Sequence, residues 1–259
     1  MTRQAVPERR YGVTSYWERS QWPLQSLYFL LPLLLLYELG TVLLAGEGAA
    51  RLPAIYAEEL LARFFRLVGI TTVHLPAVLV VVVLGVMHLV RRDPWRPELK
   101  LYPLMLGESI VYALPLFVLS TMAAGGAVAA AVFLQAQAGL ENAGVLTRSW
   151  GAGMTFALGA GIYEELLFRM IAIAAVHAVL RDVIALPVRV CDWVAVVSAA
   201  LLFAGYHFVG VDGFDLPLFC FYALAGLYLG VIYITRGFGI VVAVHALYDV
   251  LAIATHLRV

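Results

Sequence analysis

Residues 217–256 decide the fold class, because they contain two apolar runs that are each close to the length needed to cross a bilayer. The first run, PLFCFYALAGLYLGVIYIT, covers residues 217–235, and the second run, GIVVAVHALYDVLAIATH, covers residues 239–256. A transmembrane helix needs about 20 mostly apolar residues. The two runs therefore predict two successive membrane-spanning helices joined by a short connection.

The composition of the whole chain points to the same class of protein. Of its 259 residues, 63% are hydrophobic and 13% are charged, and the mean hydropathy is +0.91. Soluble domains usually contain about 45–50% apolar and about 25% charged residues. We therefore predict an all-α, polytopic transmembrane helical bundle of about seven spans, at residues 23–45, 74–90, 104–134, 151–180, 190–209, 217–235 and 239–256.

The third and fourth of these spans are longer than one crossing needs, so we expect each to be tilted or broken. Proline interrupts the helical hydrogen-bond pattern, and broken helices are tolerated in membranes where they line a protein interior. The candidate break points are Pro103, Pro115 and the Gly125-Gly126 pair.

The segment between the first two spans, residues 52–70, has apolar residues at helical spacing. Its charged residues fall on the opposite side of such a helix; they are Glu58, Glu59, Arg63 and Arg66. This pattern predicts an amphipathic helix that lies on the membrane surface. An ordinary connector helix outside the membrane is the alternative.

The basic residues predict the orientation of the chain. Eleven Lys and Arg residues fall on the side of the N-terminal tail and five on the opposite side, and cytoplasmic loops carry the excess of basic residues. We expect residues 1–22 to be a cytoplasmic tail and residues 23–259 to be a single integral-membrane domain of a multi-pass protein in the plasma (inner) membrane. The net charge of zero gives no indication of a nucleic-acid partner.

The stretch GIYEELLFRM, residues 161–170, places three charged residues in an otherwise apolar segment. A charge at mid-bilayer costs about 2.5–3.5 kcal/mol on insertion scales, so each one needs a structural or functional reason. Glu165 and Arg169 are four residues apart and can form an ion pair on one helix face. Glu164 points about 100° away from Glu165, which makes it the candidate general base. The alternative is that all three charges only hold helices together.

Two later segments carry further ionisable groups. His207 closes the stretch LLFAGYHF, while His245 and Asp249 share one helix face because they are four residues apart. Two histidines and a carboxylate can bind zinc with an open position for water. Without a metal, the same groups can activate water and stabilise an oxyanion. Both routes lead to hydrolysis, although the sequence contains neither HExxH nor GxSxG.

Three motifs in this part of the chain resemble those of one family. EELLFR (residues 164–169) matches EExxxR, FAGYH (203–207) matches FxxxH, and HALYD (245–249) matches HxxxN or HxxxD. These are the motifs of the CPBP family of intramembrane proteases, which includes the type II CAAX prenyl endopeptidases and the bacterial Abi proteins. The motifs cover residues 164–249, and the resemblance implies a core domain at about 104–256.

The resemblance implies an intramembrane endopeptidase that cleaves a membrane-embedded or membrane-anchored protein or peptide substrate in the lipid bilayer. Glu164 would activate the attacking water with help from His207, and His245 with Asp249 would stabilise the oxyanion. The remaining motif positions would support the site; they are Glu165, Arg169 and Phe203.

Asp249 stands where the prenyl endopeptidases usually carry Asn. A carboxylate cannot donate a hydrogen bond to an oxyanion unless it is protonated, so we expect Asp249 to orient His245 or to lie in the outer shell of a metal site. The resemblance leaves the cofactor open, because the family is described both as metalloproteases and as metal-free glutamate proteases. We favour the metal-free mechanism, since Glu164 then serves as the base. In the zinc-dependent alternative, Glu164, His207 and His245 would bind the metal.

Two other functions are compatible with the sequence. One is a non-catalytic membrane scaffold or partner-stabilising protein, and the other is a proton-coupled transporter, because Glu and His chains relay protons. Transporters often contain repeated halves, and no such repeat occurs in this chain. If all spans were straight, His207 and His245 would lie at different depths, so their convergence on Glu164 needs a broken or shifted segment. His177 is about 20 Å along a helix from Glu164 and is left out of the site.

Overall fold

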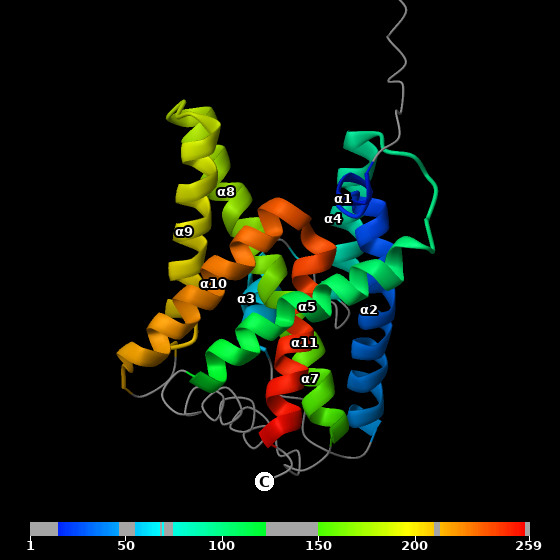
Figure 1. Ribbon diagram of the computed structural model, residues 1–259, viewed down its shortest axis with the longest axis vertical. Helices are drawn as coiled ribbons and strands as arrows, with labels where there is room; N and C mark the ends of the chain where they lie inside the picture. The colour runs from blue at the N-terminus through cyan, green and yellow to red at the C-terminus, as the bar shows by residue number, and fades with distance from the viewer. Residues whose placement is uncertain are drawn as a thin grey trace, which may run out of the picture.

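The computed structural model describes residues 15–46, 55–67, 69, 75–122, 150–209 and 213–256, and all regular structure within them is helical (Figure 1). The predicted all-α class is therefore confirmed. The elements are α1 (Tyr16–Arg19), α2 (Pro23–Gly46), α3 (Tyr56–Leu67), α4 (Leu75–Arg91), α5 (Leu101–Met122), α7 (Trp150–Glu165), η2 (Leu166–Ala172), α8 (Ile173–Ala178), η3 (Val179–Val183), α9 (Val188–Tyr206), α10 (Leu216–Arg236) and α11 (Phe238–His256).

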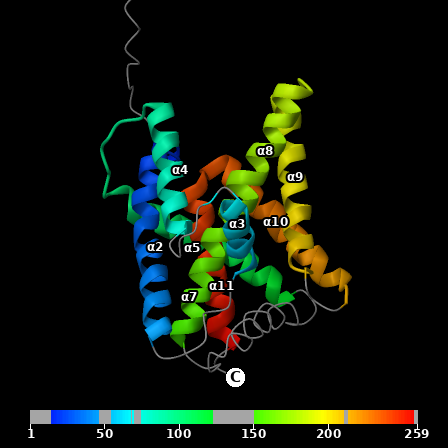
Figure 2. The same ribbon diagram turned by 180° about the vertical axis from the view of Figure 1, so that it is seen from behind.

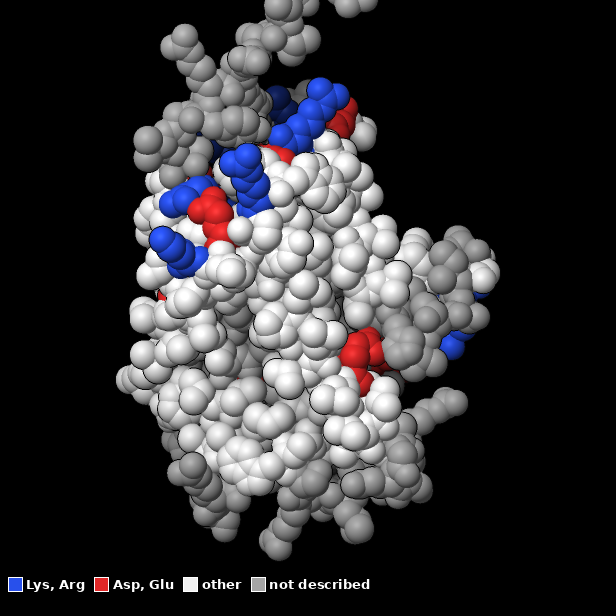
Figure 3. Space-filling model, turned by 90° about the vertical axis from the view of Figure 1, so that its right-hand side faces the viewer, with Lys and Arg blue, Asp and Glu red and all other residues white. Residues whose placement is uncertain are grey.

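Five of the described helices, α2, α5, α9, α10 and α11, are long and apolar enough to cross a membrane. The second predicted span is the shorter apolar helix α4. The fourth is α7 continued by η2, α8 and η3, so the expected interruption is two π-helical segments inside one helix. The count of seven spans is not confirmed. Figure 3 shows a broad uncharged zone on one face, below a group of Lys and Arg residues.

The proposed break points do not interrupt the helices where the structure can test them. Pro103 lies in the first turn of α5, where a missing backbone N–H costs no helical hydrogen bond, and Pro115 lies inside α5, which continues past it. The Gly125-Gly126 pair and the end of the predicted third span lie outside the described residues.

The helix α11 is the centre of the bundle and contacts α7, α5, α10 and α2. In its apolar window 72% of the residues are buried, against 22–39% in the other four candidate spans. Close approach to α7 is possible because Gly161 has no side chain; a Cβ there would lie 2.8 Å from the backbone nitrogen of Ala246. Small residues at such crossings let two helix backbones come together in a membrane.

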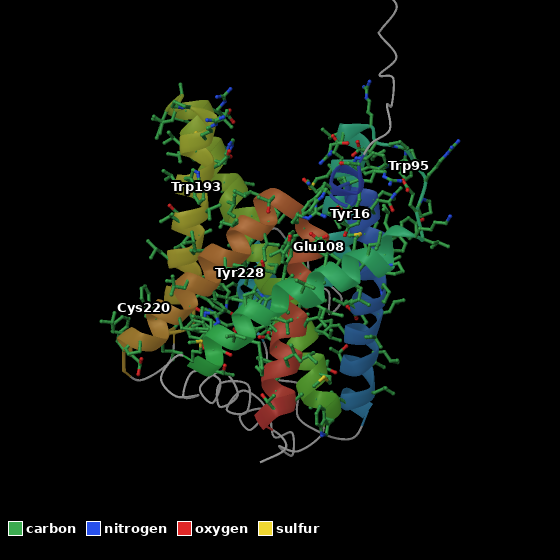
Figure 4. All side chains as sticks on the ribbon, in the orientation of Figure 1. Tyr16, Trp95, Glu108, Trp193, Cys220 and Tyr228 are labelled. Carbon is green, nitrogen blue, oxygen red and sulfur yellow. The ribbon has the colours of Figure 1, made fainter. Side chains whose placement is uncertain are left out.

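The junction between α10 and α11 lies inside the bundle, because α10 runs obliquely towards the centre (Figure 1). Arg236 is the last residue of α10 and is only 1% exposed. It donates to both carboxylate oxygens of Glu108, at 2.5 and 2.8 Å, and to the Ser20 hydroxyl at 2.9 Å. Figure 4 shows Glu108 and Tyr16 beside this junction, where the Tyr16 hydroxyl donates to Glu108 at 2.5 Å. The buried cation is thus fully neutralised.

The amphipathic helix α3 packs into the bundle rather than lying only on a membrane surface. Figure 2 shows it in front of the central helices, and it contacts α7. Ala57 and Leu61 are buried, whereas Glu59 and Arg63 form an exposed ion pair at 2.5 Å. The predicted amphipathic helix is confirmed, and protein covers only part of its apolar face, since Phe64 and Leu67 remain exposed.

We expect Glu108→Leu to destabilise the bundle, because it leaves the Arg236 guanidinium buried without its counter-charge. Removing one partner of a buried ion pair costs about 3–5 kcal/mol. The measurement is the thermal unfolding midpoint of the purified protein in detergent. The double variant Glu108→Leu/Arg236→Met should recover most of the loss, and Glu59→Ala, at an exposed pair, should change the midpoint little. Equal losses in the single and double variants would contradict the assignment.

Candidate active site

Four of the ionisable residues singled out in the sequence meet in the middle of the bundle. Oε2 of Glu164 lies 3.9 Å from Nε2 of His207 and 3.8 Å from Nε2 of His245. Nε2 of His245 also lies 3.5 Å from Oδ2 of Asp249. The three sequence motifs therefore contribute to one site, which is buried among α7, the end of α9 and α11.

The convergence depends on where the helices begin and end. His207 is the first residue after α9, and Glu164 is in the last turn of α7, just before the π-helical segment η2. The helix α11 begins inside the bundle at the α10–α11 junction (Figure 1), so His245 is brought level with Glu164. With straight spans, His207 and His245 would lie at different depths, so a broken or shifted segment was expected. The oblique α10 is that segment. Single π-helical turns inside α-helices are frequent at functional sites.

The predicted ion pair between Glu165 and Arg169 is confirmed, and Glu165 has a second partner. Nη1 of Arg169 lies 3.0 Å from Oε1 of Glu165, and both side chains are almost completely buried. Nδ1 of His245 lies 2.6 Å from the same oxygen. An ionised carboxylate only accepts hydrogen bonds, so Nδ1 carries the proton and Nε2 is directed at Glu164. The orienting contact at Nδ1 thus comes from Glu165, whereas Asp249, which we expected to orient His245, approaches Nε2.

Arg169 connects this network to two further helices. Its guanidinium lies 4.4 Å from the centre of the Phe203 ring, and Nη2 donates to the carbonyl of Gly226 at 3.3 Å. The Phe203 ring in turn lies 4.6 Å from the His207 ring and 6.0 Å from the His245 ring. Phe203, the first residue of the second motif, is therefore packed between the cation and both imidazoles.

His207 is held by contacts that the motifs did not reveal. Its Nδ1 lies 2.8 Å from the carbonyl oxygen of Phe203, one turn earlier in α9. Because a carbonyl only accepts, Nδ1 of His207 is the donor and Nε2 keeps its lone pair towards Glu164. The ring stacks on Tyr222 of α10, with centroids 3.8 Å apart. In the sequence, Tyr222 is one aromatic residue among many in an apolar run, so no pattern distinguished it.

The first turn of α3 lies against the site through a group of tyrosines. The Tyr206 hydroxyl accepts a hydrogen bond from the backbone N–H of Ala57 at 2.9 Å. The Tyr37 hydroxyl lies 3.5 Å from Oε2 of Glu58 and 3.3 Å from the Tyr163 hydroxyl. Burial raises the pKa of the Glu58 carboxyl, and the hydrogen bonds from Tyr163 and Tyr37 partly oppose that rise. Sequence analysis gave this helix no role in the site.

A cavity of about 580 Å³ lies apart from these residues, between α4, α8 and the start of α11. Of the described residues that line it, none is Glu164, His207, His245 or Asp249. His177, which we left out of the site, lines this cavity and pairs with Asp192 at 3.2 Å.

The donor atoms do not fit the zinc alternative in their present arrangement. Tetrahedral zinc with bonds of about 2.0–2.1 Å places its ligand atoms about 3.3 Å apart, whereas Glu164 is 3.8–3.9 Å from the two histidine nitrogens. Over the described part of the chain, no three His, Cys, Asp or Glu side chains are placed so that they could hold a metal ion.

Comparison with known proteins identifies the region that carries the site. Residues 147–251 match the family model described as Type II CAAX prenyl endopeptidase Rce1-like. The matched region contains all three motifs, and it confirms the family resemblance that they predicted. Neither the curated proteins nor the solved structures give a match. Together with the apolar helices, the family supports an integral membrane protein and, at the family level, an intramembrane endopeptidase.

We expect Gly161→Ala to disturb the site, because the added Cβ would lie 2.8 Å from the Ala246 backbone and push α11 away from α7. Inserting a methyl group into a well-packed contact costs about 1–3 kcal/mol, and the shift would also move His245 away from Glu164. The measurement is the unfolding midpoint in detergent. Gly151→Ala is the matched control on the same helix, since a Cβ there has no neighbour within 4 Å. The packing argument fails if the two variants unfold at the same temperature.

Proposed function

We propose that this protein is an intramembrane endopeptidase in which Glu164 activates the attacking water. The observation that carries the proposal is that Oε2 of Glu164 faces Nε2 of both His207 and His245 in a buried site. The family match supports the same class of reaction. A site shielded from bulk water strengthens every electrostatic interaction that acts on the reacting groups.

In the first step, the Glu164 carboxylate takes a proton from a water molecule while the water oxygen attacks the carbonyl carbon of the scissile peptide bond. The lone pair on Nε2 of His207 accepts a hydrogen bond from that water and aligns it. A general base in hydrogen-bond reach contributes about 10²–10⁴-fold to the rate. Because the carboxylate lies 3.9 Å from His207, one water molecule can contact both groups.

The attack forms a tetrahedral intermediate with negative charge on the former carbonyl oxygen. His245 stabilises that charge when Nε2 carries a proton, and the carboxylates of Glu165 at Nδ1 and Asp249 at 3.5 Å favour the protonated ring. Glu164 then passes its proton to the amide nitrogen, the carbon–nitrogen bond breaks, and the products are a carboxylic acid and an amine. Asp249 thereby contributes without donating a hydrogen bond itself.

The proposed substrate is a membrane-embedded or membrane-anchored protein or peptide. Charged residues such as Glu164 and Arg169 lie within helices whose outer surfaces are apolar, so a substrate segment would reach the site from the membrane rather than from open solution. We further propose that the N-terminal side faces the cytoplasm of a plasma (inner) membrane, since the basic residues are concentrated on that side.

Replacing the base tests the mechanism directly. We expect Glu164→Gln to lower the rate by at least about 10²-fold, because the amide cannot accept the proton from water. The measurement is cleavage of a membrane-anchored peptide reporter in proteoliposomes. His177→Ala is the control, since His177 is partly exposed, pairs with Asp192 outside the site and should leave the rate unchanged. Full activity of a folded Glu164→Gln protein would remove the proposed function.

The metal-free mechanism makes a separate prediction. Because the rate depends on a carboxylate base and on imidazoles already fixed by protein contacts, exhaustive dialysis against a chelator should leave turnover unchanged. The measurement compares reporter cleavage before dialysis, after dialysis, and after addition of zinc. Loss of activity that zinc restores would replace the glutamate mechanism by a metal-dependent one.

A further inference from the structure

We propose that Tyr206 is a positioning residue of the active site, which fixes the Glu164 carboxylate, and that the first turn of α3 holds Tyr206 in place. The inference rests on the proposed function, since it assigns a role to a residue beside the proposed base. Tyr206 is the last residue of α9, directly before His207. It lies between motif positions, and neither the motifs nor the composition singled it out.

The direction of the hydrogen bonds at the Tyr206 hydroxyl follows from the chemistry of its two partners. The backbone N–H of Ala57 can only donate, and it does so to this oxygen at 2.9 Å. Among the described residues, the Glu164 carboxylate is the only charged side chain that acts on the same hydroxyl, and an ionised carboxylate can only accept. A hydroxyl has a single proton to donate, so that proton is directed at Glu164. The carboxylate therefore receives a fixed donor from protein on the side of α3.

The Tyr206 ring cannot easily turn away from this position. Its centroid lies 5.1 Å from the Phe168 ring, 5.1 Å from the His207 ring and 5.6 Å from the Tyr56 ring. Phe168 belongs to η2 and Tyr56 to α3, while His207 directly follows Tyr206 at the end of α9. Two other elements and the next residue in the chain therefore hold the ring. The hydroxyl is placed by packing as well as by hydrogen bonds, as groups that position a reacting atom need to be.

The helix α3 can supply this hydrogen bond without giving up a hydrogen bond of its own. The first four N–H groups of an α-helix have no partner within the helix, and Ala57 is the second residue of α3. Ala57 is 0% exposed, and the neighbouring Ile55 and Leu61 are also buried. Glu58, next to Ala57, is attached to Tyr37 of α2. The first turn of α3 is thus fixed on both sides of the N–H that reaches Tyr206.

A fixed donor limits the orientations of the Glu164 carboxylate. The base must present one oxygen to the attacking water while it also faces two imidazoles. A small misplacement of a catalytic group can cost about 10²-fold in rate. Loss of the Tyr206 hydroxyl should therefore slow the chemical step while substrate binding changes little.

The first experiment compares Tyr206→Phe with Tyr228→Phe in the reporter assay. Tyr206→Phe keeps the ring contacts and removes the donor, and we expect kcat to fall about 10–100-fold with KM changed less than about twofold. Tyr228→Phe also loses one hydroxyl hydrogen bond, to the carbonyl of Tyr112 at 2.9 Å, but it faces α5 (Figure 4) and should leave kcat unchanged. An unchanged kcat in Tyr206→Phe, or an equal fall in both variants, overturns the proposal.

The second experiment tests the link to α3. Ala57→Pro removes the N–H that binds Tyr206, and proline is tolerated in the first turn of a helix. We expect kcat to fall as in Tyr206→Phe, with no further fall in the double variant, because residues that act through one contact are not additive. Ala57→Gly keeps the N–H and is the matched control. Additive losses in the double variant would show that α3 acts independently of Tyr206.

Glu164→Gln in the same assay separates the two proposals. If Glu164→Gln retains full activity, the proposed function and the role of Tyr206 both fail. If Glu164→Gln is inactive while Tyr206→Phe keeps its kcat, the proposed function stands and only the role of Tyr206 fails.

Discussion

The carboxylate of Glu165 makes the contact on which the rest of the site depends. One of its oxygens binds the guanidinium of Arg169 and the imidazole of His245 at once, so a single buried anion neutralises a buried cation and fixes a ring from another helix. In an apolar interior a charge without such a partner is very costly. The pairing therefore determines that α11 lies against the end of α7, and it leaves Nε2 of His245 directed towards Glu164.

The need to neutralise a buried charge also determines the position of the α10–α11 junction. Arg236 is buried and meets Glu108 of α5, Ser20 and the ring of Trp17. These contacts keep the α10–α11 junction inside the bundle instead of at a membrane face. The starting depth of α11 fixes the depth of His245 two turns later, so a neutralised cation far from the chemistry helps to decide whether the two histidines can meet.

Much of this fold and site was predictable from the sequence. Contacts between residues far apart in the chain were not. Apolar runs predicted the helices, and the i,i+4 spacing predicted the pair of Glu165 and Arg169. No spacing could pair Glu165 with His245, which is 80 residues away. The contact of α3 with α7 was not predicted, because an amphipathic pattern does not show which part of the apolar face protein covers. The count of seven spans is not confirmed, because α4 is shorter than the other candidate spans and α7 is continued by π-helical segments that apolar length does not reveal.

The central position of α11 has a consequence for the biosynthesis of the protein. This helix follows α2, α5 and α7 in the chain, yet it is the most buried of the candidate spans and it supplies His245 and Asp249. While the ribosome is still producing this part of the chain, Glu164 and His207 have no imidazole from α11 beside them. Under the proposed function, the nascent protein is therefore inactive as a protease. Peptide-bond cleavage begins only after α11 has inserted among helices already in the membrane.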